Sequence, residues 1–273
     1  MVIQLTRTAL IEDSAAILLA TDDVSEALAE AAGAHAAFLQ FGALRSADDA
    51  FALPYLDRYR LHWDTYKTKR EDVGFRSAPL ATKTEAESVL AAALGWLAHR
   101  AADRWLPAAS EEAELCRDAY LFRARYAKPD AKLDAAALVE LFEVLKQRYF
   151  IEMHTFKPDS DDIEGWFDAL YAGMQAWDAY MGRFAKAVAE PDADGERRHV
   201  LEENFYRADD AIVALANTLR SGGTATAEER EAALAAEPVS RYGQALRAAV
   251  GSLQQANAFF ARRVDELTLE ASN

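Results

Sequence analysis

One stretch of the sequence places side chains of metal-binding type at helical spacing. Glu196, His199 and Glu203 form the pattern ExxHxxxE, which brings two carboxylates and an imidazole to one face of a helix. A ferritin-like di-metal centre would also need a second ExxH motif, and the sequence has none. At about 100° per residue the three positions lie opposite Leu201, which is at the centre of the apolar stripe of that predicted helix. We therefore expect a solvated polar face, and we predict no metal or organic cofactor.

A second acidic pattern lies near the N-terminus. Asp22, Asp23 and Glu26 match the DDxxE pattern with which helical prenyl-transferring and terpene enzymes hold magnesium and a diphosphate. The second metal-binding motif of such enzymes is not evident in this sequence. Acidic residues just after Thr21 also suit the positive end of a starting helix, and this is the interpretation that we favour.

Histidine and cysteine offer proton-transfer or nucleophilic chemistry. His35 falls in an apolar stripe with Leu28 and Phe38, so we expect it to point inward, as a hydrogen-bonded core histidine rather than a ligand or a base. Cys116 has no second cysteine with which to form a disulfide or a thiolate metal site, and we expect an inert thiol. The sequence contains no phosphate-binding GxxxxGK[ST] loop, no GxSxG elbow and no HExxH motif.

A cationic cluster occurs in residues 58–70, RYRLHWDTYKTKR. On a helix that begins near Pro54 the aromatic residues share one buried face, and acidic residues at four-residue spacing offset much of the positive charge. Four residues of this helix remain as a small cationic edge: Arg58, His62, Lys69 and Arg70. Arg76, in the irregular segment that follows, lies beside them in the sequence. We predict a contact for an anion or an acidic partner here, and the alternative is a solvated helix face.

A stripe of methionine and aromatic residues follows Ser160 with a period of 3.5 residues. Core packing explains most of it, but further aromatic residues, Tyr180 among them, lie off the stripe and widen the apolar face. If the protein has an apolar pocket or a groove for a partner helix, we expect it on this helix, lined by Trp166, Met174, Trp177 and Met181.

Composition limits the classes of partner. The chain has 273 residues, with 30 Lys and Arg against 45 Asp and Glu, and a formal net charge of −15. This charge opposes non-specific binding to nucleic acid or to an anionic membrane. Glu12 and Asp13 interrupt the apolar run that a signal peptide would need, and no run approaches the ~20 apolar residues of a membrane-spanning helix. With a single cysteine, these features predict a soluble cytoplasmic protein, with no nucleic-acid binding and no membrane insertion.

The elements that must position these residues are all predicted to be helices, because apolar residues recur at three- and four-residue spacing and alternating strand patterns are absent. We predict an all-α multi-helix bundle of about eight or nine helices, whose C-terminal half consists of long antiparallel helices with coiled-coil-like seams. We treat residues 1–273 as one domain, with 1–130 and 131–273 as an alternative subdivision. The predicted helices lie near 7–20, 22–41, 54–71, 84–106, 111–127, 160–189, 196–219, 226–236 and 240–267.

Two functions fit this sequence. The first is a non-catalytic cytoplasmic interaction protein, such as an adaptor, assembly factor or chaperone-like module, which binds a protein partner and self-associates through a long helix seam. The second is a helical enzyme or small-molecule binder with an apolar inter-helix pocket and a metal or organic cofactor, in which His35, His62, Glu196 and His199 are the first residues to consider. An enzyme requires polar side chains from separate helices to converge in a cavity, whereas an adaptor requires an exposed contact surface.

Overall fold

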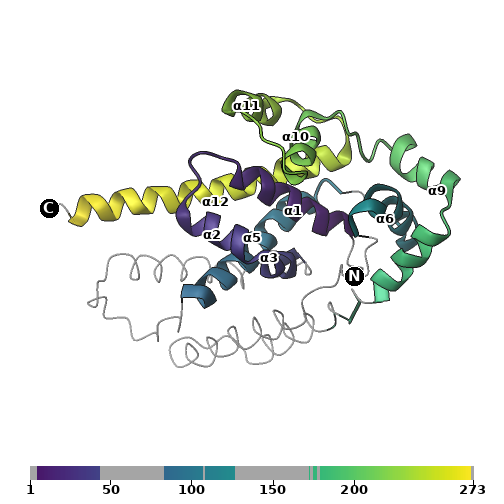
Figure 1. Cartoon of the computed structure of the whole chain (residues 1–273), viewed down its shortest axis with the longest axis horizontal. Helices are drawn as coiled ribbons and strands as arrows, with labels where there is room; N and C mark the ends of the chain where they lie inside the picture. Colours follow the sequence, from purple (N-terminus) through teal and green to yellow (C-terminus); the bar gives the residue numbers. More distant parts are fainter. Residues whose placement is uncertain are drawn as a thin grey trace.

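The computed structural model describes residues 5–43, 83–106, 108–126, 172, 175–176 and 179–271, and within these ranges every regular element is a helix (Figure 1). The prediction of an all-α bundle is thus confirmed. None of the helices in these ranges is both long and apolar enough to cross a membrane. The elements, besides a helical segment at 179–189, are α1 (Leu5–Leu19), α2 (Glu26–Ala34), α3 (Ala36–Ala43), α5 (Lys83–Asp103), α6 (Glu111–Tyr126), α9 (Ala193–Arg197), the π-helical turn η1 (Arg198–Glu202), α10 (Ala211–Arg220), α11 (Ala227–Ala235) and α12 (Arg241–Ala271).

In the N-terminal half, α1, α5 and α6 match their predicted positions closely, and the helix predicted at 54–71 lies outside the described residues. The single helix predicted at 22–41 is two helices. The chain leaves helical geometry at His35, where φ is −120° and ψ is 43°, and α3 begins at the next residue. Ser25 is the N-cap of α2.

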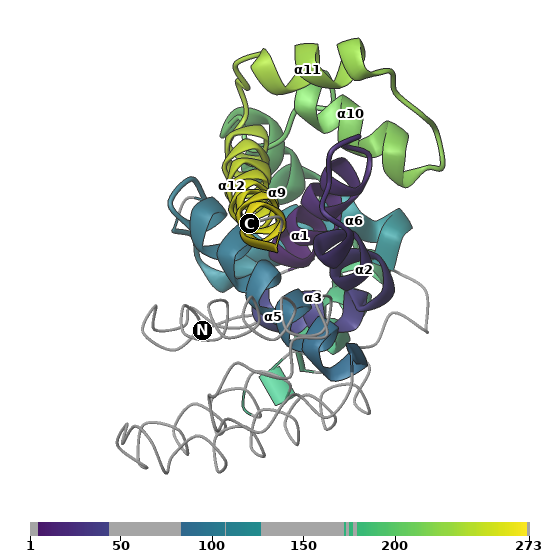
Figure 2. The same cartoon turned by 90° about the vertical axis from the view of Figure 1, so that its left-hand side faces the viewer.

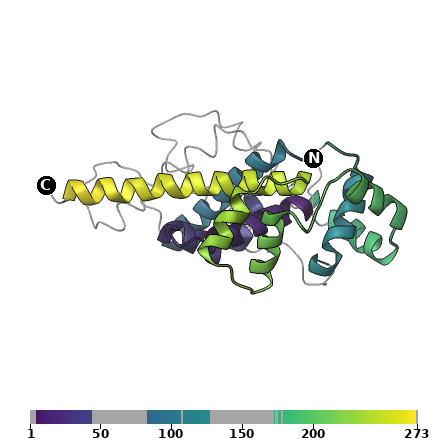
Figure 3. The same ribbon diagram turned by 90° about the horizontal axis from the view of Figure 1, so that it is seen from above.

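Two C-terminal helices follow their sequence signals. The predicted capping box opens α11, since the Glu229 N–H donates to Thr226 Oγ1 at 3.2 Å and the Thr226 N–H donates to Glu229 Oε2 at 2.7 Å. The predicted long final helix is α12, with 31 residues. It runs along the bundle, and its C-terminal end extends past the other described helices (Figures 1 and 3).

The prediction of a single helix at 196–219 is wrong. The chain leaves the helix after η1 and regains it only at α10, and Asn204 between them has a φ of 50°. In this interval the backbone N–H of Tyr242 donates to the carbonyl of Phe205 at 2.9 Å, and the Phe205 ring is buried under the Arg117 guanidinium. Hydrogen bonds to the start of α12 therefore replace the intrahelical ones that the sequence pattern predicts.

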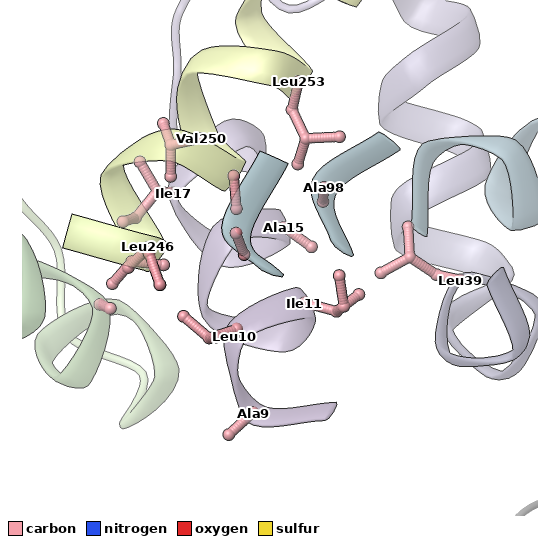
Figure 4. Packing of buried hydrophobic residues seen from close by; sticks show 14 of the residues in the cluster. Ala9, Leu10, Ile11, Ala15, Ile17, Leu39, Ala98, Leu246, Val250 and Leu253 are labelled. Atoms are coloured by element: carbon pink, nitrogen blue, oxygen red, sulfur yellow. The ribbon is translucent and has the colours of Figure 1, made fainter. Parts of the chain in front are cut away.

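The hydrophobic core lies where α1, α5 and α12 pack together, with α3 and α10 at its sides. Figure 4 shows Leu246 and Val250 of α12 beside Ile17 of α1, and Ala98 and Leu39 nearby. The buried cluster contains residues from position 5 to position 253, so both halves of the chain contribute to it. Viewed along α12, the three central helices lie side by side (Figure 2).

Buried polar residues fix the first helix against its neighbours. The fully buried Asp118 carboxylate of α6 accepts hydrogen bonds from the Leu5 N–H at 2.8 Å, the Thr6 N–H at 3.1 Å and the Tyr180 hydroxyl. It thereby caps the N-terminus of α1 from another helix. Burial raises the pKa of Asp118 to about 6, although these hydrogen bonds act in the opposite direction.

A second buried carboxylate is that of Asp13, which belongs to α1. It accepts hydrogen bonds from Arg125 of α6 at 2.9 Å and from the Tyr242 hydroxyl of α12 at 2.7 Å, and its Oδ1 lies 3.3 Å from Arg220 Nε of α10. These acidic residues thus join separate helices to one another. They are positioned by the packing of the bundle and have paired partners already.

Candidate functional site

An open groove of about 500 Å³ lies between the C-terminal end of α5 and the first half of α12. On the α5 side it is lined by Ala101 and by Arg104 and Trp105, which follow the last residue of the helix. Glu237 and Pro238, just before α12, complete part of the lining. This concave surface exposes both an aromatic and cationic side chains.

The groove follows from the pattern of residues on α12. Leu246 and Leu253 are buried against the core, while the neighbouring face carries small and polar residues, with Ala248 and Gly251 among the residues that line the groove. A Cβ atom at Gly251 would meet no atom within 4 Å, which shows that the space beside this backbone is open. Ser252 holds the two helices together, since its hydroxyl donates to the Leu97 carbonyl of α5 at 3.4 Å.

The charged residues of the groove make it locally cationic in an acidic protein. The Arg104 guanidinium carbon lies 5.6 Å from the ring centroid of Trp105, whose side chain is 37% exposed. In the described ranges no carboxylate forms an ion pair with Arg104. Arg247 pairs with Glu237, so the lining has two arginines and one glutamate.

An exposed tryptophan beside two arginines is suited to binding a ligand. Tryptophan and arginine are the residues that most often dominate the free energy of protein–protein contacts, because each combines a large contact area with a directional polar group. A guanidinium also matches the geometry of a carboxylate with two parallel hydrogen bonds. The groove can therefore hold a ligand that has an apolar part for Trp105 and an acidic group for an arginine.

The three residues of the ExxHxxxE pattern do not all face solvent as expected. Glu196 is only 4% exposed and accepts a hydrogen bond from Arg123 of α6 at 2.9 Å, whereas Leu201, the expected centre of the apolar stripe, is 54% exposed. Glu196 lies in α9, before η1, and it is buried where α9 contacts α6 and where it pairs with Arg123. Leu201 lies within η1, whose five-residue turns depart from the α-helical register on which the expectation rested. His199 Nδ1 lies 2.9 Å from Glu203 Oε1. In the described part of the chain no three His, Cys, Asp or Glu residues are arranged to hold a metal ion.

The acidic residues of the DDxxE pattern have separate partners. The exposed Asp22 pairs with Arg230 of α11, and the backbone carbonyl of Asp23 accepts from Asn257 of α12 at 3.1 Å. Glu26 is the first residue of α2, so the helix start comes later than the sequence pattern suggested. Asp22 and Asp23 thus join the turn before α2 to α11 and α12.

The inward orientation and hydrogen bonding predicted for His35 are confirmed. Its Nε2 lies 3.1 Å from Glu87 Oε2 and its Nδ1 lies 3.3 Å from Ser88 Oγ, both on α5, and its ring meets the edge of Phe38. Sequence reasoning overlooked a second histidine of this kind, His99, which is 2% exposed. Its place within an alanine-rich stretch of the 84–106 pattern was the available signal.

Neither ring nitrogen of His99 has a hydrogen-bond partner among the described residues. Burial lowers the pKa of His99 to about 4, and the nearby positive charge of Arg7 acts in the same direction. The histidine is therefore neutral at pH 7. His99 is not among the residues that line the groove.

Most residues predicted to line a pocket or a cationic edge lie outside the described residues: Trp166, Met174, Trp177, Arg58, His62, Lys69, Arg70 and Arg76. Met181 is described, and it is partly buried against the core. Tyr180, expected to widen an apolar face, is instead fully buried and bonded to Asp118. Burial and nearby carboxylates raise the pKa of the Cys116 thiol, which disfavours the reactive thiolate.

The groove residues Arg104, Trp105 and Arg247 were not predicted from the sequence. The signal on α12 was a row of small and polar residues at three- and four-residue spacing beside the apolar stripe. Comparison of the chain with models of known protein families, with curated proteins and with solved structures gave no match.

Proposed function

We propose that the protein is a non-catalytic helical interaction protein that binds a segment of a partner protein in the groove between α5 and α12. The observation that supports this most directly is the exposed Trp105, stacked by Arg104 and placed on an open groove that also contains Arg247. These side chains have the chemistry of a contact surface. The cytoplasmic location predicted from the sequence is retained as part of the proposal.

The open shape of the groove favours a peptide segment over a small substrate. Sites for small molecules usually surround most of the ligand surface, whereas a groove that is open to solvent accommodates a chain that continues beyond it. In the described residues the buried acidic side chains of α1 and α6, Asp13 and Asp118, bond to neighbouring helices. Their interactions are those of structural side chains that join helices.

Site-specific photocross-linking tests the proposal. A benzoylphenylalanine replaces Gln255, which lines the groove, and in a control it replaces the exposed Glu231 of α11. We expect the groove position to attach to one defined segment of one protein in cells, and we expect this product to disappear when Ala248→Trp fills the groove. Equal labelling from both positions, or a product that Ala248→Trp leaves unchanged, would contradict the proposal.

Native mass spectrometry with metal analysis of the purified protein separates the proposal from the alternative function. The interaction protein is expected to carry no stoichiometric small molecule or metal. A bound metal or organic cofactor of defined mass would favour the helical enzyme instead.

A further inference from the structure

We propose that the segment bound in the groove is acidic, and that its carboxylates pair with Arg104 and replace Glu237 on Arg247. This inference rests on the proposed function and adds the chemistry of the partner. Three features of the groove support it: an arginine without a carboxylate partner, an exchangeable ion pair and apolar side chains that are exposed beside them.

The free anion position is at Arg104. Its guanidinium carbon lies 5.6 Å from the centroid of the Trp105 ring, and Arg104 is exposed, so solvent reaches its N–H donors. In the described residues no acidic side chain pairs with it. A carboxylate that approached from solvent could accept two parallel hydrogen bonds here without displacing a protein group.

The exchangeable position is at Arg247. The Glu237 side chain that pairs with it is 82% exposed, and it comes from the turn directly before α12. An ion pair so exposed to water contributes little to folding stability. Glu237 therefore marks where an incoming carboxylate would bind, and it can swing into solvent when a partner supplies one.

The length of the groove lining along α12 sets the length of the bound segment. The lining of α12 runs from Gln244 to Gln255, which is twelve residues and about 16 Å along the helix axis. An extended segment of about five residues has this length. Trp105 and the exposed Val239, which follows the lining residue Pro238, provide apolar contacts for a non-polar side chain between the acidic ones.

Charge selects this partner over a nucleic acid. The groove has two arginines, but the whole chain has a net charge of −15, which repels a long polyanion. A short acidic segment with an apolar residue gains from the local arginines and makes few contacts with the acidic remainder of the surface.

A peptide-display library of random 12-residue segments, selected on the full-length chain, tests the inference. The enriched peptides are expected to carry a net negative charge and at least one large apolar residue. Synthetic copies are then titrated calorimetrically. Arg104→Gln or Arg247→Gln should weaken their binding by about tenfold, whereas Glu237→Gln should strengthen it by up to about fivefold, because it removes a competitor for Arg247.

Matched substitutions at exposed positions outside the groove lining serve as controls. Arg197→Gln on α9 and Glu228→Gln on α11 change the net charge equally, and they should leave the affinity unchanged. Thermal unfolding of each variant verifies that the fold is retained, which is expected because Arg104 and Glu237 are exposed.

The possible results are distinguishable. Enriched peptides that are neutral or basic, but lose binding with Ala248→Trp, would overturn the acidic specificity and leave the proposed function intact. Peptides that Ala248→Trp does not affect, or a failure to enrich any peptide, would overturn both. If sodium glutamate or inorganic phosphate alone bound as tightly as the peptides, the groove would be a site for small anions and the inference would be wrong.

Discussion

At the scale of single residues, the two buried histidines have opposite surroundings. His35 interacts with Glu87 and Ser88, while neither ring nitrogen of His99 has a partner in the described residues. A buried polar group without a hydrogen bond costs free energy, since it has given up water and gained nothing in return. His99 is therefore a local source of instability in the core.

Replacing His99 with leucine should stabilise the protein. The substitution removes an unpaired buried polar group and keeps a side chain of comparable volume, so we expect the free energy of unfolding at pH 7 to rise by about 1 to 2 kcal/mol. Urea denaturation measures the change. His35→Leu is the matched control and should lower stability, because it deletes the contacts with Glu87 and Ser88. Equal effects of the two substitutions would contradict this account.

His99 should also determine part of the pH dependence of the free energy of unfolding. The pKa of His99 is about 4 in the folded protein and about 6.5 in an unfolded chain. Between these values the unfolded state binds a proton that the folded state excludes, so the free energy of unfolding falls as the pH falls, by about 3 kcal/mol in total. Asp118 acts in the opposite sense: with its pKa raised to about 6, the folded state binds its proton more readily, and this contribution increases stability as the pH falls from about 6 to 4.

The pH prediction is tested by denaturant unfolding between pH 7 and pH 4. Relative to the wild-type protein, His99→Leu should gain progressively more stability as the pH falls below about 6.5, and the gain should level off near pH 4. A difference between the two proteins that stays constant over this range would show that His99 titrates normally.

At the scale of helices, two glycines show how closely neighbouring elements approach. A Cβ atom at Gly95 of α5 would lie 1.9 Å from the backbone carbonyl oxygen of Leu39 in α3, whereas a Cβ atom at Gly251 of α12 would contact nothing. Gly95 is thus required for the contact between α3 and α5. Gly251 is a helix-interior glycine without such a requirement, beside the open groove.

The two alanine substitutions should therefore have opposite signs. Gly95→Ala forces α3 and α5 apart and should destabilise the protein by about 1 to 3 kcal/mol. Gly251→Ala avoids the entropic cost of glycine in a helix and should stabilise it by about 1 kcal/mol. Urea denaturation of both variants, with helix content checked by circular dichroism, measures these changes. Stabilisation by Gly95→Ala would show that the two helices do not approach as closely as described.

The helices themselves were largely predictable because local patterns specify them. The apolar periodicity located α1, α5, α6 and α12, and the Thr226 capping box located α11. The break between η1 and α10 was not predictable from a window of the sequence, since it depends on backbone hydrogen bonds from the start of α12 to residues 204 and 205. Before this break, Leu201 of η1 is exposed and Glu196 of α9 is buried beside Arg123, which is the reverse of the expected pattern.

The groove was missed for a related reason. Arg104 and Arg247 are 143 positions apart in the sequence, and only the packing of α5 against α12 brings them to one surface. Each helix alone shows an ordinary polar face. Sequence periodicity indicates which face of a helix is buried, but it does not indicate which two polar faces will border the same groove.

At the scale of the whole molecule, α12 packs in the core with its first half and projects from it with its second half. Leu246 and Leu253 pack into the core, and the helix continues to Ala271, beyond the other described helices (Figures 1 and 3). In the sequence the apolar stripe also continues, through Phe260, Val264 and Leu267. A stripe at this spacing on a projecting helix is suited to pair with the same helix of a second copy.

Self-association through this stripe, which is part of the function predicted from the sequence, predicts a concentration-dependent mass in sedimentation velocity. Replacing Phe260, Val264 and Leu267 together with alanine should shift the protein to the monomer, because alanine keeps the helix but removes most of the apolar area of the seam. Alanine at Arg262 and Glu266, on the opposite side of the helix by its periodicity, should leave the association unchanged. A wild-type protein that stays monomeric at all concentrations, or a triple variant that associates equally well, would show that α12 serves only the core of its own chain.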